Sequence, residues 1–214
     1  MPEAMFSVRA LSCARGDRVL FGGVSFELHA GEALHIRGPN GHGKTTLLRA
    51  LCGLGRPLRG DIRWRGERVR DLGDEFYAVL AYLGHLNGLR DELTAAENVW
   101  TYARIHGGAD CDGKTVRAAL ARVGLAAAAG RPARHMSQGQ KRRLALACLL
   151  VVDRPLWLLD EPFTALDVAS VGALVSLIEE HLHGGGVALI VSHQAFDLPG
   201  IRAFDLEHFV RVKR

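Results

Sequence analysis

The sequence predicts an α/β protein with a parallel-sheet core, an antiparallel β lobe near the N-terminus and an inserted helical lobe. Residues 5–29 alternate apolar and polar side chains, which is the pattern of half-buried antiparallel strands. Residues 156–160 and 187–192 are mainly apolar runs, as expected of parallel strands that are buried on both faces. Residues 90–152 have helical spacing and interrupt a chain in which strands and helices otherwise alternate.

The N-terminal half is expected to begin with a β-hairpin that turns at residues 15–17, Arg-Gly-Asp. In its second strand the apolar residues of 24–28 share one face, and polar residues alternate with them. Residues 33–37 then predict a short strand that ends in a glycine-rich loop. Leucines at helical spacing predict a helix over 45–54 directly after this loop.

The helical lobe and the last third of the chain have clear start and stop signals. Thr94-Ala-Ala-Glu97 has the spacing of a capping box and predicts a helix to about His106. Residues 115–123 predict a second helix, which Gly124 would end. Between the two apolar strands, a further helix is predicted from apolar residues at helical spacing: Val171, Leu174, Val175, Ile178 and Leu182.

These elements predict a single domain over 1–214, built from three parts. The expected parts are a β lobe (about 1–32 and 55–75), a core (33–54 and 153–200) and a helical lobe (90–152). With 48% hydrophobic and 23% charged residues, the chain is not collagen-like, disordered or a disulfide-stapled miniprotein. The four cysteines form no C-x-x-C pair, so we expect reduced thiols.

Charge and hydropathy bear on the class of partner. The longest apolar run, Leu144 to Val152, is much shorter than the roughly 20 residues of a membrane-spanning helix. The net charge of +4 is compatible with nucleic acid or an acidic membrane surface. However, acidic residues are mixed throughout, and the arginines of 63–70 fit a solvated strand face. We therefore expect no nucleic-acid partner.

The strongest motif follows the strand predicted at 33–37. Gly38-Pro-Asn-Gly-His-Gly-Lys-Thr45 matches the phosphate-loop pattern G-x-x-x-x-G-K-[ST] in full, between a predicted strand and a predicted helix. Glycines let amide groups approach a phosphate, and the helix dipole favours the same anion. Lys44 would neutralise β- and γ-phosphate oxygens, and Thr45 would bind Mg²⁺. The expected nucleotide-binding residues are Gly38, Pro39, Asn40, Gly41, His42, Gly43, Lys44, Thr45 and Thr46.

Two carboxylates end the apolar run 156–160. A carboxylate at the end of a buried strand is costly unless it meets a cation. Asp160 is therefore predicted to hold Mg²⁺, and Glu161 to act as a general base that activates water. Taken alone, the pair also fits two exposed acids at a strand end. Together with the phosphate loop it predicts a P-loop NTPase with a RecA-like core.

Met136-Ser-Gln-Gly-Gln140 resembles the L-S-G-G-Q signature of the ABC-transporter ATPase family, with Met136 and Gln138 as departures. The retained Ser137, Gly139 and Gln140 are expected to reach a phosphate. Ser137 and Gln140 also have capping-box spacing, so a plain helix start is the alternative interpretation. The resemblance runs from about Phe6 to Ser192.

The family resemblance implies roles for four further residues. Asp167 matches the D-loop, and His193 matches the histidine that senses the γ-phosphate. Arg15 stands where the family usually stacks an aromatic residue on adenine, which an arginine plane can also do. His85 stands where the family has a glutamine near the attacking water or the Mg²⁺ shell. The resemblance also implies a homodimer, with ATP between one chain's phosphate loop and the other's MSQGQ.

Three segments resemble one branch of the family, the ATP-binding subunits of haem exporters in cytochrome c maturation: Gly84-His85, Leu93-Thr-Ala-Ala-Glu-Asn98 and the run 156–167. The branch implies Mg·ATP hydrolysis that drives a separate integral membrane subunit, together with haem-pathway proteins. It also implies peripheral attachment at the cytoplasmic face of the cell inner membrane, through a groove near residues 85–93.

The residues themselves show no haem chemistry. The chain has no C-x-x-C-H motif, and His106, His181, His183 and His208 are expected to be solvated. One alternative is an ATPase subunit of a drug or lipid exporter. Another is an ABC ATPase that acts on ribosomes or DNA without transport, although the chain has neither two cassettes nor a long coiled-coil insertion. A P-loop kinase is a remote third, in which MSQGQ would have no role.

Overall fold

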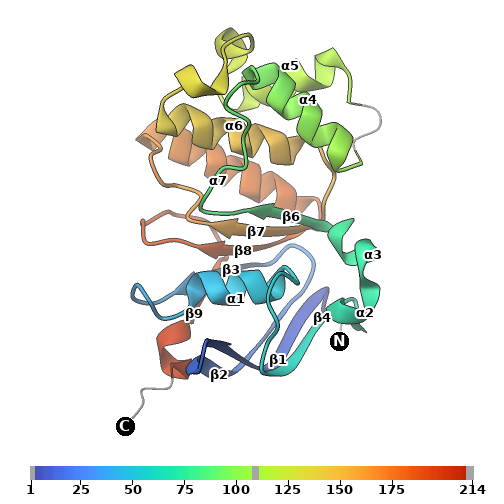
Figure 1. The fold of residues 1–214 in the computed structure, drawn as a ribbon, viewed down its shortest axis with the longest axis vertical. Helices are drawn as coiled ribbons and strands as arrows, with labels where there is room; N and C mark the ends of the chain where they lie inside the picture. Colours follow the sequence, from blue (N-terminus) through green and yellow to red (C-terminus); the bar gives the residue numbers. More distant parts are fainter. Residues whose placement is uncertain (1–2, 108–110, 211–214) are drawn as a thin grey trace.

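The computed structural model describes residues 3–107 and 111–210. The predicted ranges that include residues 1–2, 108–110 and 211–214 therefore extend outside the described residues. Figure 1 shows a layered molecule with an antiparallel sheet at one end, a parallel sheet across the middle and a group of helices at the other end. This arrangement agrees with the predicted α/β fold class.

The antiparallel sheet is 4-stranded, with the order β2-β1-β4-β5. Its strands are β1 (Phe6–Arg15), β2 (Arg18–Leu28), β4 (Arg59–Trp64) and β5 (Glu67–Arg68). The predicted hairpin is β1 and β2, which pair antiparallel around Gly16 at φ 57°. Along β2 Val24 and Leu28 are fully buried while Ser25 is exposed, so the alternation in sequence does produce one apolar face.

The parallel sheet is 5-stranded, with the order β6-β7-β8-β3-β9. Its strands are β3 (Ala33–Arg37), β6 (Leu80–Leu83), β7 (Leu156–Asp160), β8 (Val187–Val191) and β9 (Arg202–Asp205). Sequence analysis predicted β3, β7 and β8 but neither of the edge strands. Because β9 pairs with β3, the sheet continues past residue 200, where the predicted core ended.

The two faces of the parallel sheet belong to two different apolar cores. Leu156 and Leu158 of β7 pack into a core with the antiparallel sheet, whereas Trp157 and Leu159 pack into a core with the helices. Successive side chains of a strand point to opposite faces, so a strand that is buried on both sides must be apolar throughout. This is why the sequence of β7 does not alternate.

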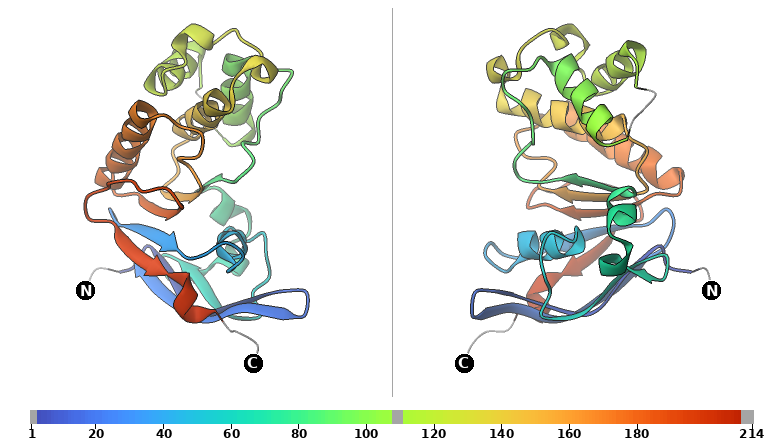
Figure 2. Two further views of the ribbon diagram at one scale, coloured as in Figure 1. Left: turned by 90° about the vertical axis from the view of Figure 1, so that its left-hand side faces the viewer. Right: turned by 45° about the vertical axis from the view of Figure 1, so that its right-hand side comes forward.

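Helix α1 (Lys44–Leu51) lies between the two sheets and follows the glycine-rich loop (Figures 1 and 2). The prediction extended this helix to residue 54, which is wrong. Gly53 takes the left-handed conformation, with φ 75°, just beyond the helix. As a result Leu54 is 56% exposed and does not join the buried leucines.

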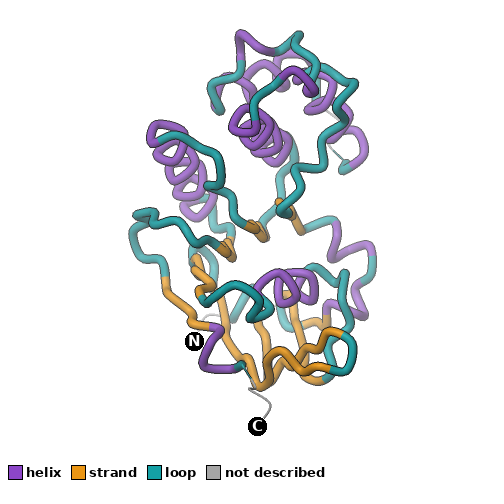
Figure 3. Tube along the Cα trace, turned by 60° about the vertical axis from the view of Figure 1, so that its left-hand side comes forward, coloured by secondary structure: helices purple, strands orange, loops and turns teal. Residues whose placement is uncertain are grey.

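The remaining helices are α2 (Val69–Leu72), α3 (Asp74–Tyr77), α4 (Ala95–Ile105), α5 (Gly113–Arg122), α6 (Gln138–Leu150) and α7 (Val168–His183). Short 3₁₀ turns span Ala126–Ala128, Ala133–His135 and Leu206–Phe209. Helices α4, α5 and α6 contact one another, while α6 and α7 also pack against the parallel sheet. Figure 3 shows most of the helices gathered at the end of the molecule opposite the antiparallel sheet. Throughout 3–107 and 111–210, the helices all fall short of the length and apolar content that crossing a membrane requires.

The predicted capping box is present at the start of α4. Thr94 Oγ1 accepts from the Glu97 amide at 3.2 Å, and the Glu97 carboxylate accepts from the Thr94 amide at 2.8 Å. One histidine expectation is wrong. His181 is not solvated, because its ring stacks on Trp157 at 4.1 Å and its Nε2 lies 3.2 Å from the Val187 carbonyl oxygen.

Candidate functional site

The glycine-rich loop connects β3 to α1 and has a backbone that few other residues could adopt. Gly38, Gly41 and Gly43 have φ values of 144°, 81° and 95°. A Cβ on Gly43 would also lie 3.0 Å from the Phe21 ring, so space and torsion both require glycine there. The loop therefore holds its amide groups at the N-terminus of α1, a position that favours an anion.

Lys44 is the first residue of α1 and is 7% exposed. Its Nζ donates to the carbonyl oxygens of Gly38 at 2.6 Å and Pro39 at 3.1 Å. Burial lowers the pKa of Lys44, and the charges of Glu161 and Asp160 act in the opposite direction. The loop carbonyls thus hold an ammonium group that faces two carboxylates.

Asp160 ends β7 and is 2% exposed. Its Oδ2 makes no hydrogen bond among the described residues. Burial and then the charge of Glu161 raise the pKa of Asp160, while His85 and the Thr45 hydroxyl lower it. A buried oxygen ligand without a partner, beside a hydroxyl, is a donor set that suits a hard cation such as Mg²⁺.

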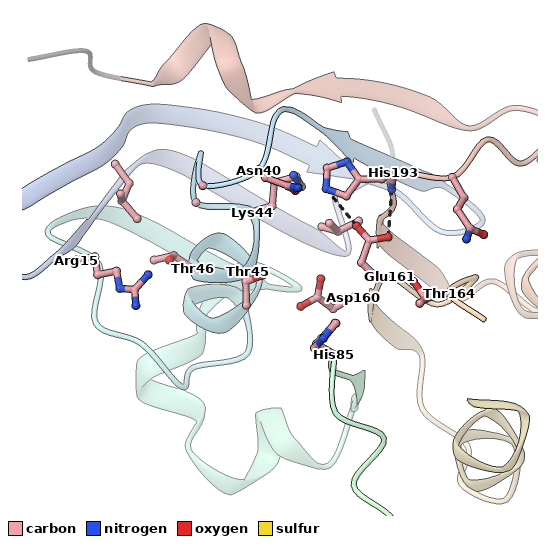
Figure 4. A pocket seen from close by; sticks show the side chains of 15 residues that line it. Arg15, Asn40, Lys44, Thr45, Thr46, His85, Asp160, Glu161, Thr164 and His193 are labelled. Atoms are coloured by element: carbon pink, nitrogen blue, oxygen red, sulfur yellow. Dashed lines mark hydrogen bonds and ion pairs between the residues drawn. The ribbon is translucent and has the colours of Figure 1, made fainter. Parts of the chain in front are cut away.

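Glu161 has the left-handed backbone conformation, with φ 51°, which is uncommon for a residue other than glycine. Its Oε2 accepts from the His193 amide at 3.1 Å, and its Oε1 lies 3.5 Å from His193 Nε2 (Figure 4). Oε1 makes no hydrogen bond in the described part of the chain. One oxygen is therefore fixed by the backbone, and the other is available to a ligand.

A cavity of about 560 Å³ brings most of the predicted residues together. It is lined by Arg15, Leu20, Asn40, Gly41, Gly43, Lys44, Thr45, Thr46, His85, Asp160, Glu161, Thr164, Val191, His193 and Gln194. Figure 4 shows Arg15 near the start of α1 and His85 beside Asp160. Gly38, Pro39 and His42 belong to the loop but do not line the cavity.

The predicted signature residues lie outside this cavity, at the start of α6. Ser137 Oγ accepts from the Gln140 amide at 3.2 Å, and Gln140 Oε1 accepts from the Ser137 amide at 2.9 Å. The capping-box interpretation is therefore realised in the structure. A Cβ on Gly139 would lie 2.5 Å from the Ala165 carbonyl oxygen, so this position requires glycine. Asp167 caps α7 instead, accepting from the Ser170 amide at 2.8 Å.

The structure adds residues that sequence reasoning missed. Leu20 and Gln194 line the cavity because chain folding places them there, whereas Thr164, which also lines it, lies within the run 156–167 but was given no role. His35 lies in β3 and is 8% exposed, with Nε2 3.1 Å from the Ser192 carbonyl oxygen. Arg142 is a buried cation in α6, and its position within an apolar helix was the available sequence signal.

Comparison with known proteins identifies the family. The family model described as ABC transporter matches residues 21–164. The cytochrome c biogenesis ATP-binding export protein CcmA of Nitrosospira multiformis is 47% identical over 190 residues, covering 89% of this chain and 92% of that protein. The protein of the same name from Paramagnetospirillum magneticum is 43% identical over 210 residues, covering 98% and 97%.

Solved structures agree on the fold. A putative ABC transporter ATP-binding protein from Pyrococcus furiosus superposes with a TM-score of 0.85 at 23% identity, covering 96% of this chain and 99% of that one. An ATP-binding subunit of an ABC transporter gives a TM-score of 0.78 at 28% identity, covering 88% and 80%. The chain therefore belongs to the ABC transporter family and is similar, over nearly its whole length, to the CcmA-type ATP-binding proteins.

Proposed function

We propose that the chain hydrolyses Mg·ATP as the ATPase subunit of a membrane transporter that serves cytochrome c biogenesis. The observation that carries the ATPase part is the cavity itself. A phosphate loop with its lysine faces a buried aspartate and a glutamate, and each carboxylate keeps one oxygen without a hydrogen bond from any described group. The names of the CcmA relatives support the transporter part.

The phosphate loop binds the β- and γ-phosphates through its amide groups. Lys44 moves its ammonium from the Gly38 and Pro39 carbonyl oxygens to phosphate oxygens when ATP enters. Thr45 and Asp160 would hold Mg²⁺ together with the phosphates, because both line the cavity with oxygen ligands and the Thr45 hydroxyl lies beside the Asp160 carboxylate. When bound, Mg²⁺ neutralises negative charge that develops on the phosphate oxygens.

Glu161 acts as the general base that accepts a proton from the attacking water. Its Oε1 is available for this proton, while the His193 amide keeps Oε2 in place. His193, which lies beside Glu161, then senses whether the γ-phosphate is present. His85 contacts the water or the Mg²⁺ shell from the side of Asp160. Arg15 stacks on adenine at the far end of the cavity, where Leu20 adds an apolar contact.

Two chains form the working unit. Ser137, Gly139 and Gln140 lie outside the cavity of their own chain, so they are free to complete the cavity of a second chain in a head-to-tail homodimer. Asp167 serves the same interface. ATP then joins the two chains, and hydrolysis releases them. A site built from two chains makes hydrolysis depend on dimer closure.

The dimer works with a separate integral membrane subunit and with haem-pathway proteins, and no nucleic acid takes part. It attaches peripherally at the cytoplasmic face of the cell inner membrane, through the surface near residues 85–93. Leu86 in this segment is 84% exposed, which supports an apolar contact there. The supply of haem to c-type cytochromes is the process that the CcmA names indicate.

Substitution of the proposed base tests the ATPase mechanism. We expect Glu161→Gln to slow steady-state hydrolysis by about 10²–10⁴-fold, because the amide cannot accept the proton. ATP binding should persist, and the variant with ATP should elute as a dimer in size-exclusion chromatography with light scattering. Glu75→Gln, at an exposed position of α3, is the matched control and should behave like the natural chain. Normal turnover in Glu161→Gln would overturn the general-base role.

A further inference from the structure

Arg142 is a buried cation whose side chain the proposed chemistry has not yet used. It is 4% exposed, and burying a guanidinium costs free energy unless its donors are satisfied. Burial lowers the pKa of Arg142 to about 10, so the group remains charged at neutral pH. The contacts around Arg142 must therefore compensate the free-energy cost of burying its charge.

All three nitrogens of the Arg142 guanidinium donate hydrogen bonds, to acceptors on two other segments. Nη2 donates to the carbonyl oxygens of Asp160 at 2.5 Å and Glu161 at 2.8 Å, and Nε donates to that of Pro162 at 3.3 Å. Nη1 donates at 2.9 Å to both the Gly84 carbonyl oxygen and Asn87 Oδ1. A guanidinium has five N–H donors, and these five bonds use them all.

These acceptors flank the reactive groups without including them. Asp160–Pro162 is the backbone that carries both carboxylates, and Gly84 and Asn87 flank His85 in the sequence; Figure 4 shows His85 beside Asp160. Glu161 also has its φ of 51° here, a strained conformation that persists only where the surroundings hold it. Arg142 donates to the carbonyl groups on either side of the Glu161 Cα, and these bonds supply part of that restraint.

We propose that Arg142 is a positioning residue that holds the Asp160–Pro162 backbone and the His85 segment, residues 84–87, in a fixed relation to helix α6. The fork of the guanidinium spans acceptors that a compact ammonium could not reach together. Because Ser137 is the N-cap of α6, a displacement of this helix in a dimer is passed directly to the backbone of the proposed base. The inference rests on the proposed general-base role of Glu161.

The test compares Arg142→Lys with Arg143→Lys in the full chain, using hydrogen exchange followed by mass spectrometry. We expect Arg142→Lys to speed amide exchange in 84–88 and 160–164 by about 10-fold, while the phosphate loop at 38–46 keeps its protection. Arg143 is the next residue of α6 and donates to Val123 and Gly124 carbonyl oxygens instead. Its lysine variant should leave both segments unchanged.

Kinetics add a readout that a general loss of stability would not give. We expect kcat of Arg142→Lys to fall by about 10–100-fold while ATP affinity stays within about 2-fold, because misplacing a base affects the transition state most. Asn87→Ala removes one Nη1 acceptor without emptying a buried site, so it provides a second variant if Arg142→Lys does not fold. It should speed exchange in 84–88 alone.

Unchanged exchange in both segments would overturn the proposal, as would losses of kcat and ATP affinity in equal proportion. The exchange experiment does not require hydrolysis. It therefore separates a failure of this inference from a failure of the general-base role, which Glu161→Gln tests independently.

Discussion

Asp160 and Glu161 each keep a carboxylate oxygen without a hydrogen bond among the described residues. A purely structural position would relieve this cost by pairing the oxygens, as most buried polar groups do. These oxygens without hydrogen bonds thus lower the stability of the folded chain. They lie where the proposed chemistry needs available ligands for a cation and a water molecule. Burial raises the pKa of Asp160, and a cation held beside it would favour the ionised form.

His85 provides a direct test at the residue scale. We expect His85→Ala to lower kcat by about 10-fold with little change in ATP affinity, because the ring lines the cavity beside Asp160 but not the phosphate loop. Steady-state ATPase assays and nucleotide titration measure the two effects. His208→Ala, an exposed histidine outside the cavity, is the control. An unchanged rate would exclude His85 from the chemistry.

Individual site residues were predictable from sequence where they belong to a contiguous motif. The phosphate loop, Asp160 and Glu161 are local patterns, and the structure places them around one cavity. Leu20 and Gln194 reach the same cavity only through the tertiary fold, so no local spacing identifies them. Arg142 was missed because its role depends on carbonyl groups that the sequence brings close only after folding.

At the element scale, the first turn of α6 has two possible uses for the same atoms. Ser137 and Gln140 cap the helix within the chain, and the proposed dimer requires them to contact nucleotide. Both uses exploit the positive end of the helix dipole. The cap therefore holds the side chains in place before any partner arrives.

We expect Ser137→Arg to abolish most ATPase activity while each chain still binds ATP, because Ser137 lies outside its own cavity. Loss of the cap should also cost about 1 kcal/mol of stability. Thr94→Arg is the matched control, since it removes the equivalent capping box of α4. It should lower the Tm similarly and leave basal hydrolysis intact. Full activity in Ser137→Arg would contradict the shared site.

Long or strongly patterned elements were predictable, and short edge strands were not. β8 is apolar throughout and β7 is apolar up to its last residue, Asp160, because both faces of these strands are covered, so their sequences indicate buried strands before the fold is known. β6 and β9 are short edge strands, and β9 is mostly exposed, so neither has a distinctive pattern. Their existence depends on backbone partners that lie far away in sequence.

At the scale of the whole molecule, two apolar cores share the parallel sheet as a common wall. The helices cover one face, and α1 with the antiparallel sheet covers the other. The cavity opens where the strands β7 and β3 end, so its floor belongs to buried strands of the parallel sheet. Reactive groups on a rigid sheet keep their relative positions.

Buried histidines predict how stability depends on pH. Burial lowers the pKa values of His35 and His181 from the usual 6.5, so both rings are neutral in the folded chain. Below that value the unfolded chain binds protons that the folded chain does not, and the free energy of unfolding falls. We expect the Tm to decrease as the pH falls below about 6.5, and less so in His181→Phe, which keeps the stack on Trp157. Parallel Tm curves for the two proteins would contradict this assignment.

The apolar faces of β7 have a further consequence for how the strand finds its place. A slip of one residue along its neighbours would still fill both cores with bulky apolar side chains, so hydrophobicity alone distinguishes the alternatives weakly. The slip would, however, drive Asp160 into an apolar core and leave the Arg142 guanidinium without its carbonyl acceptors. The polar end of β7 therefore also favours the native register of the strand. Substitutions that weaken the proposed reactive site would at the same time reduce the free-energy difference between the native register and the shifted one.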